Sequence, residues 1–180
     1  MKVVSTNIGV RKNIDWKGTS IETGIFKHPV ASVFLEKEDV KGDSVIDRRY
    51  HGGVNKAVYA YSVDHYPFWK NLYPDLDWGF GMFGENLTVE GLEETNIHIG
   101  NSYKVGNAII EVTEPREPCV KLGVRFNNAK IIKQFWNETK SGVYFKVLQP
   151  GEIKAGDVFE LLKSKKENKT IAEEYLARKL

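Results

Sequence analysis

Residues 102–113, SYKVGNAIIEVT, contain two runs of β-branched and aromatic side chains on either side of Gly106 and Asn107. A Gly-Asn pair readily adopts the positive φ angles that a two-residue hairpin turn requires. The flanking runs have the residue types that favour strands. The stretch therefore predicts a β-hairpin with strands over residues 102–105 and 108–113.

Similar runs occur on both sides of this hairpin. Further strands are expected over residues 3–10, 23–33, 57–61, 143–148 and 158–162. Glycine and proline are spread between these runs, and nothing in the order of elements predicts the alternating strands and helices of a parallel sheet. Frequent short strands with turns between them predict a mainly β fold, either a β-barrel or a strongly bent sandwich.

Three helices are expected among these strands, over residues 64–73, 128–137 and 170–180. The second has apolar side chains at i, i+4 spacing, which is typical of a helix that packs on one face. The third begins with Thr170 and Glu173, which have the spacing of a capping box. A helix of this length is marginal in isolation, so we expect it to dock on the rest of the chain.

The composition is that of a globular protein. The chain has 180 residues, 41% hydrophobic and 28% charged, with a formal net charge of +2 and one cysteine. This charge is too small to indicate a nucleic-acid or membrane surface. No apolar run is long enough for a signal peptide or a membrane span. We expect a soluble cytoplasmic protein, with one domain over residues 1–162 and a charged linker plus amphipathic helix over residues 163–180.

The single cysteine, Cys119, lies in the charged and proline-containing stretch EPREPCVK, residues 114–121. The two prolines resist both a helix and a central strand. Arg116 and Lys121 are close enough in sequence to favour a thiolate, the form that attacks substrates or binds metals. A lone cysteine is also often a small buried hydrophobic residue. The motif by itself leaves both interpretations open.

The most concentrated group of cations is DRRYHGGVNK, residues 47–56. Adjacent glycines such as Gly52 and Gly53 let backbone N–H groups point inward and surround an anion. Arg48, Arg49, His51 and Lys56 add positive charge or hydrogen-bond donors. The segment lacks the ending of a P-loop. It indicates an oxyanion or phosphate site, with a solvated turn beside a strand as the alternative.

A third segment, GFGMFGENLT at residues 79–88, has three glycines within six residues. Such a loop can approach a ligand closely, although it can equally be a hairpin loop packed by its two phenylalanines. The histidines lack the i, i+4 spacing of a zinc site. A nucleophilic pair of Cys119 and His51, as in a cysteine-dependent hydrolase, stays open because catalytic partners are often distant in sequence.

Taken together, these segments resemble the MOSC domain, the family named after the C-terminal region of molybdenum cofactor sulfurase. The resemblance rests on four stretches that occur in the family's order: residues 48–59, 83–88, 106–119 and 142–157. Within the family, the chain is most similar to stand-alone bacterial proteins of the YiiM type. The resemblance implies a MOSC-type β-barrel with a few peripheral helices and a short C-terminal helix.

The resemblance also implies a binding site for molybdenum cofactor, a pterin whose dithiolene sulfurs hold the metal. Cys119 is then the molybdenum ligand, a role that suits a soft thiolate. Cys119, His51 and Arg116 are the implied catalytic residues. The implied cofactor-binding residues are Arg49, Gly52, Gly53, Lys56, Tyr59, Gly84, Glu85, Asn86, Thr88 and Arg116.

The activity implied by the resemblance is reduction of N-hydroxylated compounds, such as hydroxylaminopurine-type base analogues and amidoximes. The chain has neither a dinucleotide-binding fingerprint nor iron–sulfur cysteines, so a separate flavoprotein or iron–sulfur protein is the expected electron donor. Pyridoxal phosphate is disfavoured because the larger sulfurases bind it in a different domain. The alternative is a non-redox module that transfers sulfur or cofactor, with Cys119 as a persulfide site.

Overall fold

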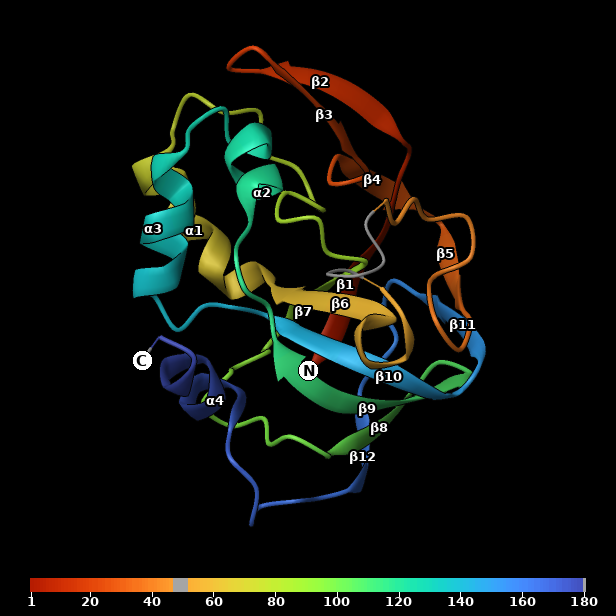
Figure 1. Cartoon of the computed structure of the whole chain (residues 1–180). Helices are drawn as coiled ribbons and strands as arrows, with labels where there is room; N and C mark the ends of the chain where they lie inside the picture. The colour runs from red at the N-terminus through yellow and green to blue at the C-terminus, as the bar shows by residue number, and fades with distance from the viewer. Residues whose placement is uncertain (47–51, 180) are drawn as a thin grey trace.

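The computed structural model describes residues 1–46 and 52–179, and its main feature is an eight-stranded sheet that curls into a half-barrel (Figure 1). In spatial order the strands are β12 (Glu160–Lys163), β8 (Ser102–Val105), β9 (Ala108–Pro115), β10 (Val143–Gln149), β6 (Val58–Ser62), β7 (Leu87–Glu90), β1 (Lys2–Gly9) and β4 (Lys27–Val30). The mainly β fold expected from the sequence is confirmed.

The predicted hairpin is formed by β8 and β9, which pair antiparallel up to Val105 and Ala108. Gly106 occupies the turn with a φ of 55°. A Cβ atom at this position would lie 2.5 Å from the carbonyl oxygen of Glu152. The turn therefore needs glycine both for its backbone angle and for the close approach of a neighbouring strand.

The curl brings the two ends of the sheet close to one another. The amide of Val3 donates to the carbonyl of Asp157 at 2.8 Å, and the amide of Phe159 donates to the carbonyl of Met1 at 3.1 Å. These bonds join the start of β1 to the segment that leads into β12. Valine, isoleucine and phenylalanine side chains from the sheet, among them Val58 and Phe145, form one continuous buried core.

Two smaller antiparallel pairs flank the main sheet. The strand β5 (Ser32–Leu35) pairs with β11 (Gly151–Lys154), and β2 (Lys12–Trp16) pairs with β3 (Thr19–Thr23). Figure 1 shows the β2–β3 hairpin projecting from one end of the molecule. Of these strands, β2 and β11 were not predicted from the sequence.

The strand-type stretch over residues 23–33, which glycine and proline interrupt, is divided among the end of β3, β4 and the start of β5. The chain turns at Ile25, whose carbonyl accepts from the amide of Lys27 at 2.9 Å. Pro29 lies in β4, where its missing amide is tolerated because β4 is an edge strand of the sheet.

The α-helices are α1 (Tyr66–Leu72), α2 (Val120–Arg125), α3 (Lys130–Asn137) and α4 (Ile171–Ala177), and two 3₁₀ turns are η1 (Val54–Lys56) and η2 (Val63–His65). The three predicted helices correspond to α1, α3 and α4, each shorter than expected, whereas α2 was not predicted. Among the described residues, no helix has the length and apolar character needed to cross a membrane.

The capping box predicted at Thr170 is confirmed at the start of α4. The amide of Glu173 donates to the Thr170 hydroxyl at 3.2 Å, and the amide of Thr170 donates to the Glu173 carboxylate at 2.8 Å. The helix docks on α3, as expected for so short an element. The ring of Tyr175 stacks on Trp136 with centroids 5.1 Å apart, and its hydroxyl donates to the carbonyl of Phe135 at 2.9 Å.

A backbone crossing near the end of β1 allows no side chain beyond glycine. A Cβ atom on Gly9 would lie 2.1 Å from the carbonyl oxygen of Gly24, and one on Gly24 would lie 1.9 Å from the carbonyl oxygen of Ser44. Three segments that are distant in sequence are thereby brought into direct backbone contact. Gly24 and Ser44 both line the pocket described below, so this crossing positions one of its walls.

We expect Gly24→Ala to lower the free energy of unfolding by about 1–3 kcal/mol, because the added methyl group can be accommodated only by moving backbone. Denaturant unfolding followed by fluorescence measures this change. Gly79→Ala is the matched control, because a Cβ atom there has no neighbour within 4 Å. We expect it to change stability by less than about 0.5 kcal/mol. Equal effects of the two substitutions would contradict the close crossing.

Candidate functional site

One pocket collects residues from several segments of the chain that are distant in sequence. It lies between the end of β3, residues 43–46, the start of β6, the loop before β7, and the segment that joins β9 to α2, and holds about 590 Å³ of solvent-open space. Its lining residues are Thr23, Gly24, Ile25, Lys27, Asp43, Ser44, Val45, Ile46, Gly52, Lys56, Ala57, Tyr59, Gly84, Asn86, Arg116, Cys119, Lys121 and Tyr144.

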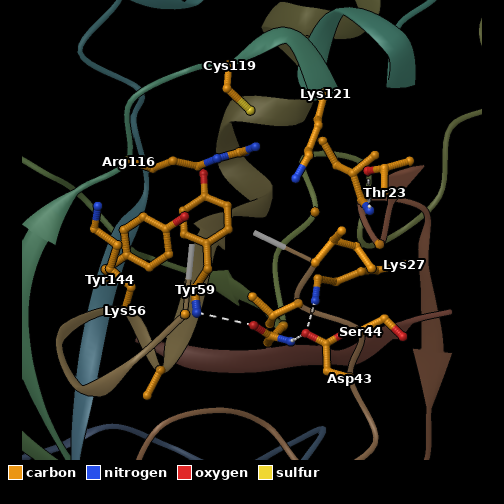
Figure 2. A pocket seen from close by; sticks show the side chains of 18 residues that line it. Thr23, Lys27, Asp43, Ser44, Lys56, Tyr59, Arg116, Cys119, Lys121 and Tyr144 are labelled. Atoms are coloured by element: carbon orange, nitrogen blue, oxygen red, sulfur yellow. Dashed lines mark hydrogen bonds and ion pairs between the residues drawn. The ribbon is translucent and has the colours of Figure 1, made fainter. Parts of the chain in front are cut away.

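The carboxylate of Asp43 organises one end of the pocket. It accepts hydrogen bonds from the amide of Gly9 at 2.7 Å and from the side-chain nitrogen of Asn86 at 2.9 Å. It also forms an ion pair with Lys27 in which both side chains are less than a tenth exposed (Figure 2). Burial lowers the pKa of Lys27, and the adjacent Asp43 carboxylate opposes that shift. The positive charge of Lys27 is therefore neutralised within the protein.

The side chain of Asn86 is part of the same arrangement. Its oxygen accepts from the amide of Tyr59 at 3.3 Å, and its backbone amide donates to the carbonyl of Tyr59 at 2.8 Å. Asn86 thus links β6 to the loop that precedes β7. It lines the pocket as predicted, but both polar groups of its side chain already have partners in the protein.

Arg116 is 4% exposed and reaches the centre of the pocket (Figure 2). Its guanidinium donates to the carbonyl of Phe83 and lies 4.9 Å from the centre of the Tyr59 ring. Burial disfavours the charged form, but the nearby Tyr59, Tyr144 and Cys119 raise its pKa above the ordinary value. No carboxylate in the described part of the chain forms an ion pair with Arg116.

Cys119 stands at the junction between β9 and α2. Pro118 precedes it, its backbone is extended, and α2 begins at the next residue. The side chain is half-buried and its sulfur is directed toward the pocket, beside Arg116 (Figure 2). Lys121, on the first turn of α2, also extends into the pocket. The structure thus brings together Arg116, Cys119 and Lys121, the three residues of the stretch 114–121 on which the sequence analysis focused.

The tyrosines of the pocket wall are neutral donors. Burial raises the pKa of Tyr144 to about 12 against the opposing effect of Arg116. Burial also raises the pKa of Tyr59, whose hydroxyl donates to the carbonyl of Ser141 at 2.8 Å. Lys56 lies 5.8 Å from the centre of the Tyr144 ring and pairs with Glu114 at 3.8 Å. Both hydroxyls remain protonated at neutral pH.

The two glycines of the predicted anion loop have different surroundings. Gly52 lines the pocket, but Gly53 does not, and its amide donates to the carbonyl of Glu38 at 3.0 Å. The amide of Gly53 is therefore engaged by the protein and is not directed at a ligand. Arg49 and His51, which the sequence placed at the same site, lie outside the described residues.

Glu85 and Thr88, which the resemblance assigned to the cofactor, are buried and lie outside the pocket lining. Glu85 is fully buried and accepts hydrogen bonds from the amides of Gly81 at 3.0 Å and Phe83 at 2.9 Å. It also accepts from the hydroxyls of Tyr66 and Thr88. Burial raises the pKa of the Glu85 carboxyl, although these bonds favour its charged form. Neither Glu85 nor Thr88 lines the pocket, so their role is to fix the loop that carries Gly84.

Lys27 and Asp43 were not identified from the sequence. Lys27 lies in an edge strand and Asp43 in an irregular segment, so neither belongs to a local motif. Only the backbone crossing near Gly24 brings them together. Tyr144 was missed for a similar reason, since its alternating strand gave no indication of which face would meet Arg116.

Comparison with known proteins places these features in a family. The MOSC domain model matches residues 47–160. YflK of Bacillus subtilis is 40% identical over 161 residues, which cover 89% of this chain and 72% of that protein. A protein named Reductase from Gibberella moniliformis is 37% identical over 150 residues, or 81% of this chain, but these cover only 26% of the fungal protein.

The fold agrees with the sequence comparison. The crystal structure of YiiM from Geobacillus stearothermophilus superimposes with a TM-score of 0.79 and 32% identity, covering 98% of this chain and 83% of that one. The matched region includes most of the curled sheet and the described residues around Cys119. The chain therefore belongs to the MOSC domain family.

Proposed function

We propose that this protein binds molybdenum cofactor in the pocket and reduces N-hydroxylated compounds such as hydroxylaminopurine-type bases and amidoximes. The observation that carries the proposal is the convergence of the Cys119 sulfur and the Arg116 guanidinium on one pocket (Figure 2). MOSC domains are associated with molybdenum-cofactor enzymes, and the fungal relative is named a reductase. Both facts support a redox function.

The charge of the pocket fits an anionic pterin. Lys56, Arg116 and Lys121 line it, and Arg116 is buried without a carboxylate partner among the described residues. A buried cation is stabilised when a ligand supplies the opposite charge. Arg116, Lys56 and Gly52 are the residues we assign to cofactor binding, together with the wall formed by Tyr59, Gly84 and Asn86.

The side chains that could bind a metal also suit this cofactor. In residues 1–46 and 52–179, no three His, Cys, Asp or Glu side chains converge in a way that would hold a metal by themselves. A molybdenum ion that is already held by two dithiolene sulfurs needs only one soft ligand more from the protein. The thiolate of Cys119 has that chemistry.

The bound cofactor would supply the two electrons that cleave the N–O bond, with uptake of two protons and release of an amine and water. The chain's own residues hold and orient the reactants. Arg116 is fixed by Phe83 and Tyr59, so its donors keep one direction. Tyr144, protonated at neutral pH, can hold a proton at the pocket wall. Such fixed donors lower the barrier because they need no reorganisation during the reaction.

We assign the supply of electrons to a separate flavoprotein or iron–sulfur protein, because the single cysteine of this chain cannot hold an iron–sulfur cluster. A cytoplasmic location, where thiols stay reduced, suits a mechanism that needs the Cys119 thiolate. The fungal reductase extends far beyond the region that resembles this chain.

Protein from a host that makes the cofactor should contain about one molybdenum atom per chain, and Cys119→Ser should lose both metal and N-hydroxy reduction because a hydroxyl is a poor soft-metal ligand. Elemental analysis and an assay with reduced viologen dye measure the two effects. Ser44→Ala, which removes a neutral side chain from the same pocket, is the matched control and should retain the metal.

Two outcomes would contradict this assignment. Metal-free protein with a persulfide on Cys119, detected by cysteine-trapping mass spectrometry, would favour a sulfur carrier. Turnover that persists in Cys119→Ser would remove the cysteine from the reaction.

The charge of Arg116 should determine how much cofactor is retained. Arg116→Gln should lower the bound pterin about tenfold, since a charged hydrogen bond is lost. Arg116→Lys keeps the charge but not the planar guanidinium, and we expect partial retention. Pterin released from purified protein is measured by fluorescence, and melting curves identify any variant that has unfolded. Equal pterin content in wild type and a folded Arg116→Gln would exclude Arg116 from the site.

A further inference from the structure

Three cations lie in the pocket or on the elements next to it, and the proposed reaction does not use two of them. Lys121 is in the pocket, Arg125 is four residues further along α2, and Lys12 is on the projecting β2–β3 hairpin. We call Lys12, Lys121 and Arg125 the cationic row. Residues four apart on a helix lie on the same face, so Lys121 and Arg125 are neighbours.

The ring of Phe26 contacts both Lys12 on the hairpin and Arg125 on α2. Lys12 lies 5.5 Å and Arg125 5.2 Å from the centre of this ring. Ile25, the residue before Phe26, lines the pocket. Two elements far apart in sequence are thus held together at the pocket edge by one aromatic side chain, and each presents a cation there.

The charges of the row are not neutralised by ion pairs. In the described part of the chain, none of its three members forms a salt bridge, and nothing accepts a hydrogen bond from the buried Nε of Arg125. Burial lowers the pKa of Arg125, while Glu85, Tyr66 and Asp77 act in the opposite direction. The adjacent Arg11 differs, because it pairs with Glu22 at 3.1 Å.

We propose that the cationic row binds the phosphate group of a phosphorylated substrate, such as a nucleotide, whose N-hydroxyl end lies in the pocket near Cys119. This inference rests on the proposed function and specifies its substrate class. The guanidinium of Arg125 supplies the fork of donors that a phosphate dianion needs, and Lys12, which contacts the same Phe26 ring, supplies further positive charge.

The length of the row favours an extended ligand. Four helical residues advance about 6 Å, so Lys121 and Arg125 are about one helical turn apart. A substrate that reacts beside Cys119 and reaches Arg125 must carry its phosphate well away from its N-hydroxyl group. A nucleoside monophosphate has that separation between base and phosphate, whereas a small phosphate ester does not. A row that begins inside the pocket also suits one bound molecule better than a protein surface, which needs a far larger contact area.

Binding is tested with cofactor-loaded protein, adenosine 5′-monophosphate and adenosine by isothermal titration calorimetry. The monophosphate should bind more tightly than the nucleoside, and Lys12→Gln or Arg125→Gln should weaken its binding about tenfold while leaving that of the nucleoside unchanged.

Arg11→Gln is the matched control, since Arg11 is next to Lys12 in the chain but already paired. Lys12 is exposed, so its variant keeps the test valid if Arg125→Gln fails to fold. Equal binding by wild type and Lys12→Gln would overturn the inference.

Turnover is measured with N⁶-hydroxyadenine, its nucleoside and its 5′-monophosphate, with a reduced dye as electron donor. The value of kcat/KM should be highest for the monophosphate, and Lys12→Gln should lower it about tenfold for that substrate alone. Equal values for all three compounds would overturn the inference but leave the reductase function standing. Phosphate-dependent binding without reduction of any compound would overturn the reductase function but not the phosphate site.

The remaining alternative is that the cationic row docks the protein that donates electrons. A loss in Lys12→Gln that occurs only when an acidic redox protein replaces the dye would assign the row to donor docking. That result would overturn the phosphate site.

Discussion

The buried carboxylate of Asp43 holds together the segments from which the pocket is built. It accepts from the amide of Gly9 in β1, from the side chain of Asn86 before β7, and from Lys27 in β4. Breaking a buried ion pair by removing one partner typically costs about 3–5 kcal/mol, because the other charge is left uncompensated. The relative positions of three sheet elements around the pocket therefore depend on one side chain from an irregular segment.

The other side of the pocket is fixed by packing and by a second buried carboxylate. Glu85 closes the glycine-containing loop through its own amides, and the loop in turn supplies the Phe83 carbonyl to Arg116. The Tyr59 ring lies against the same guanidinium. Arg116 is thus held in place by neutral groups, which position its charge without cancelling it. This is the physical reason that the pocket favours an anion.

The cations at the site differ in whether a carboxylate pairs with them. Lys27, at one end of the pocket, is neutralised by Asp43, whereas no carboxylate among the described residues pairs with Arg116 in the centre. The charge continues outward along α2 to Arg125 and across Phe26 to the hairpin. A cofactor in the pocket and a phosphorylated substrate along its edge would each meet unneutralised cations. The proposed chemistry and the proposed substrate class therefore rest on the same electrostatic arrangement.

The sequence by itself determined the features whose causes are local. The hairpin at Gly106 and the capping box at Thr170 follow from residues within a few positions of each other, and both are found. The family resemblance was visible in the sequence because each of its four motifs is a short local stretch and the four occur in the family's order. The tertiary structure was needed to show that Glu85 is buried against the amides of its own loop and that Lys27 is neutralised by a distant carboxylate. Such roles depend on which backbone segments cross, and that is set by close glycine contacts and burial between segments that no local pattern relates.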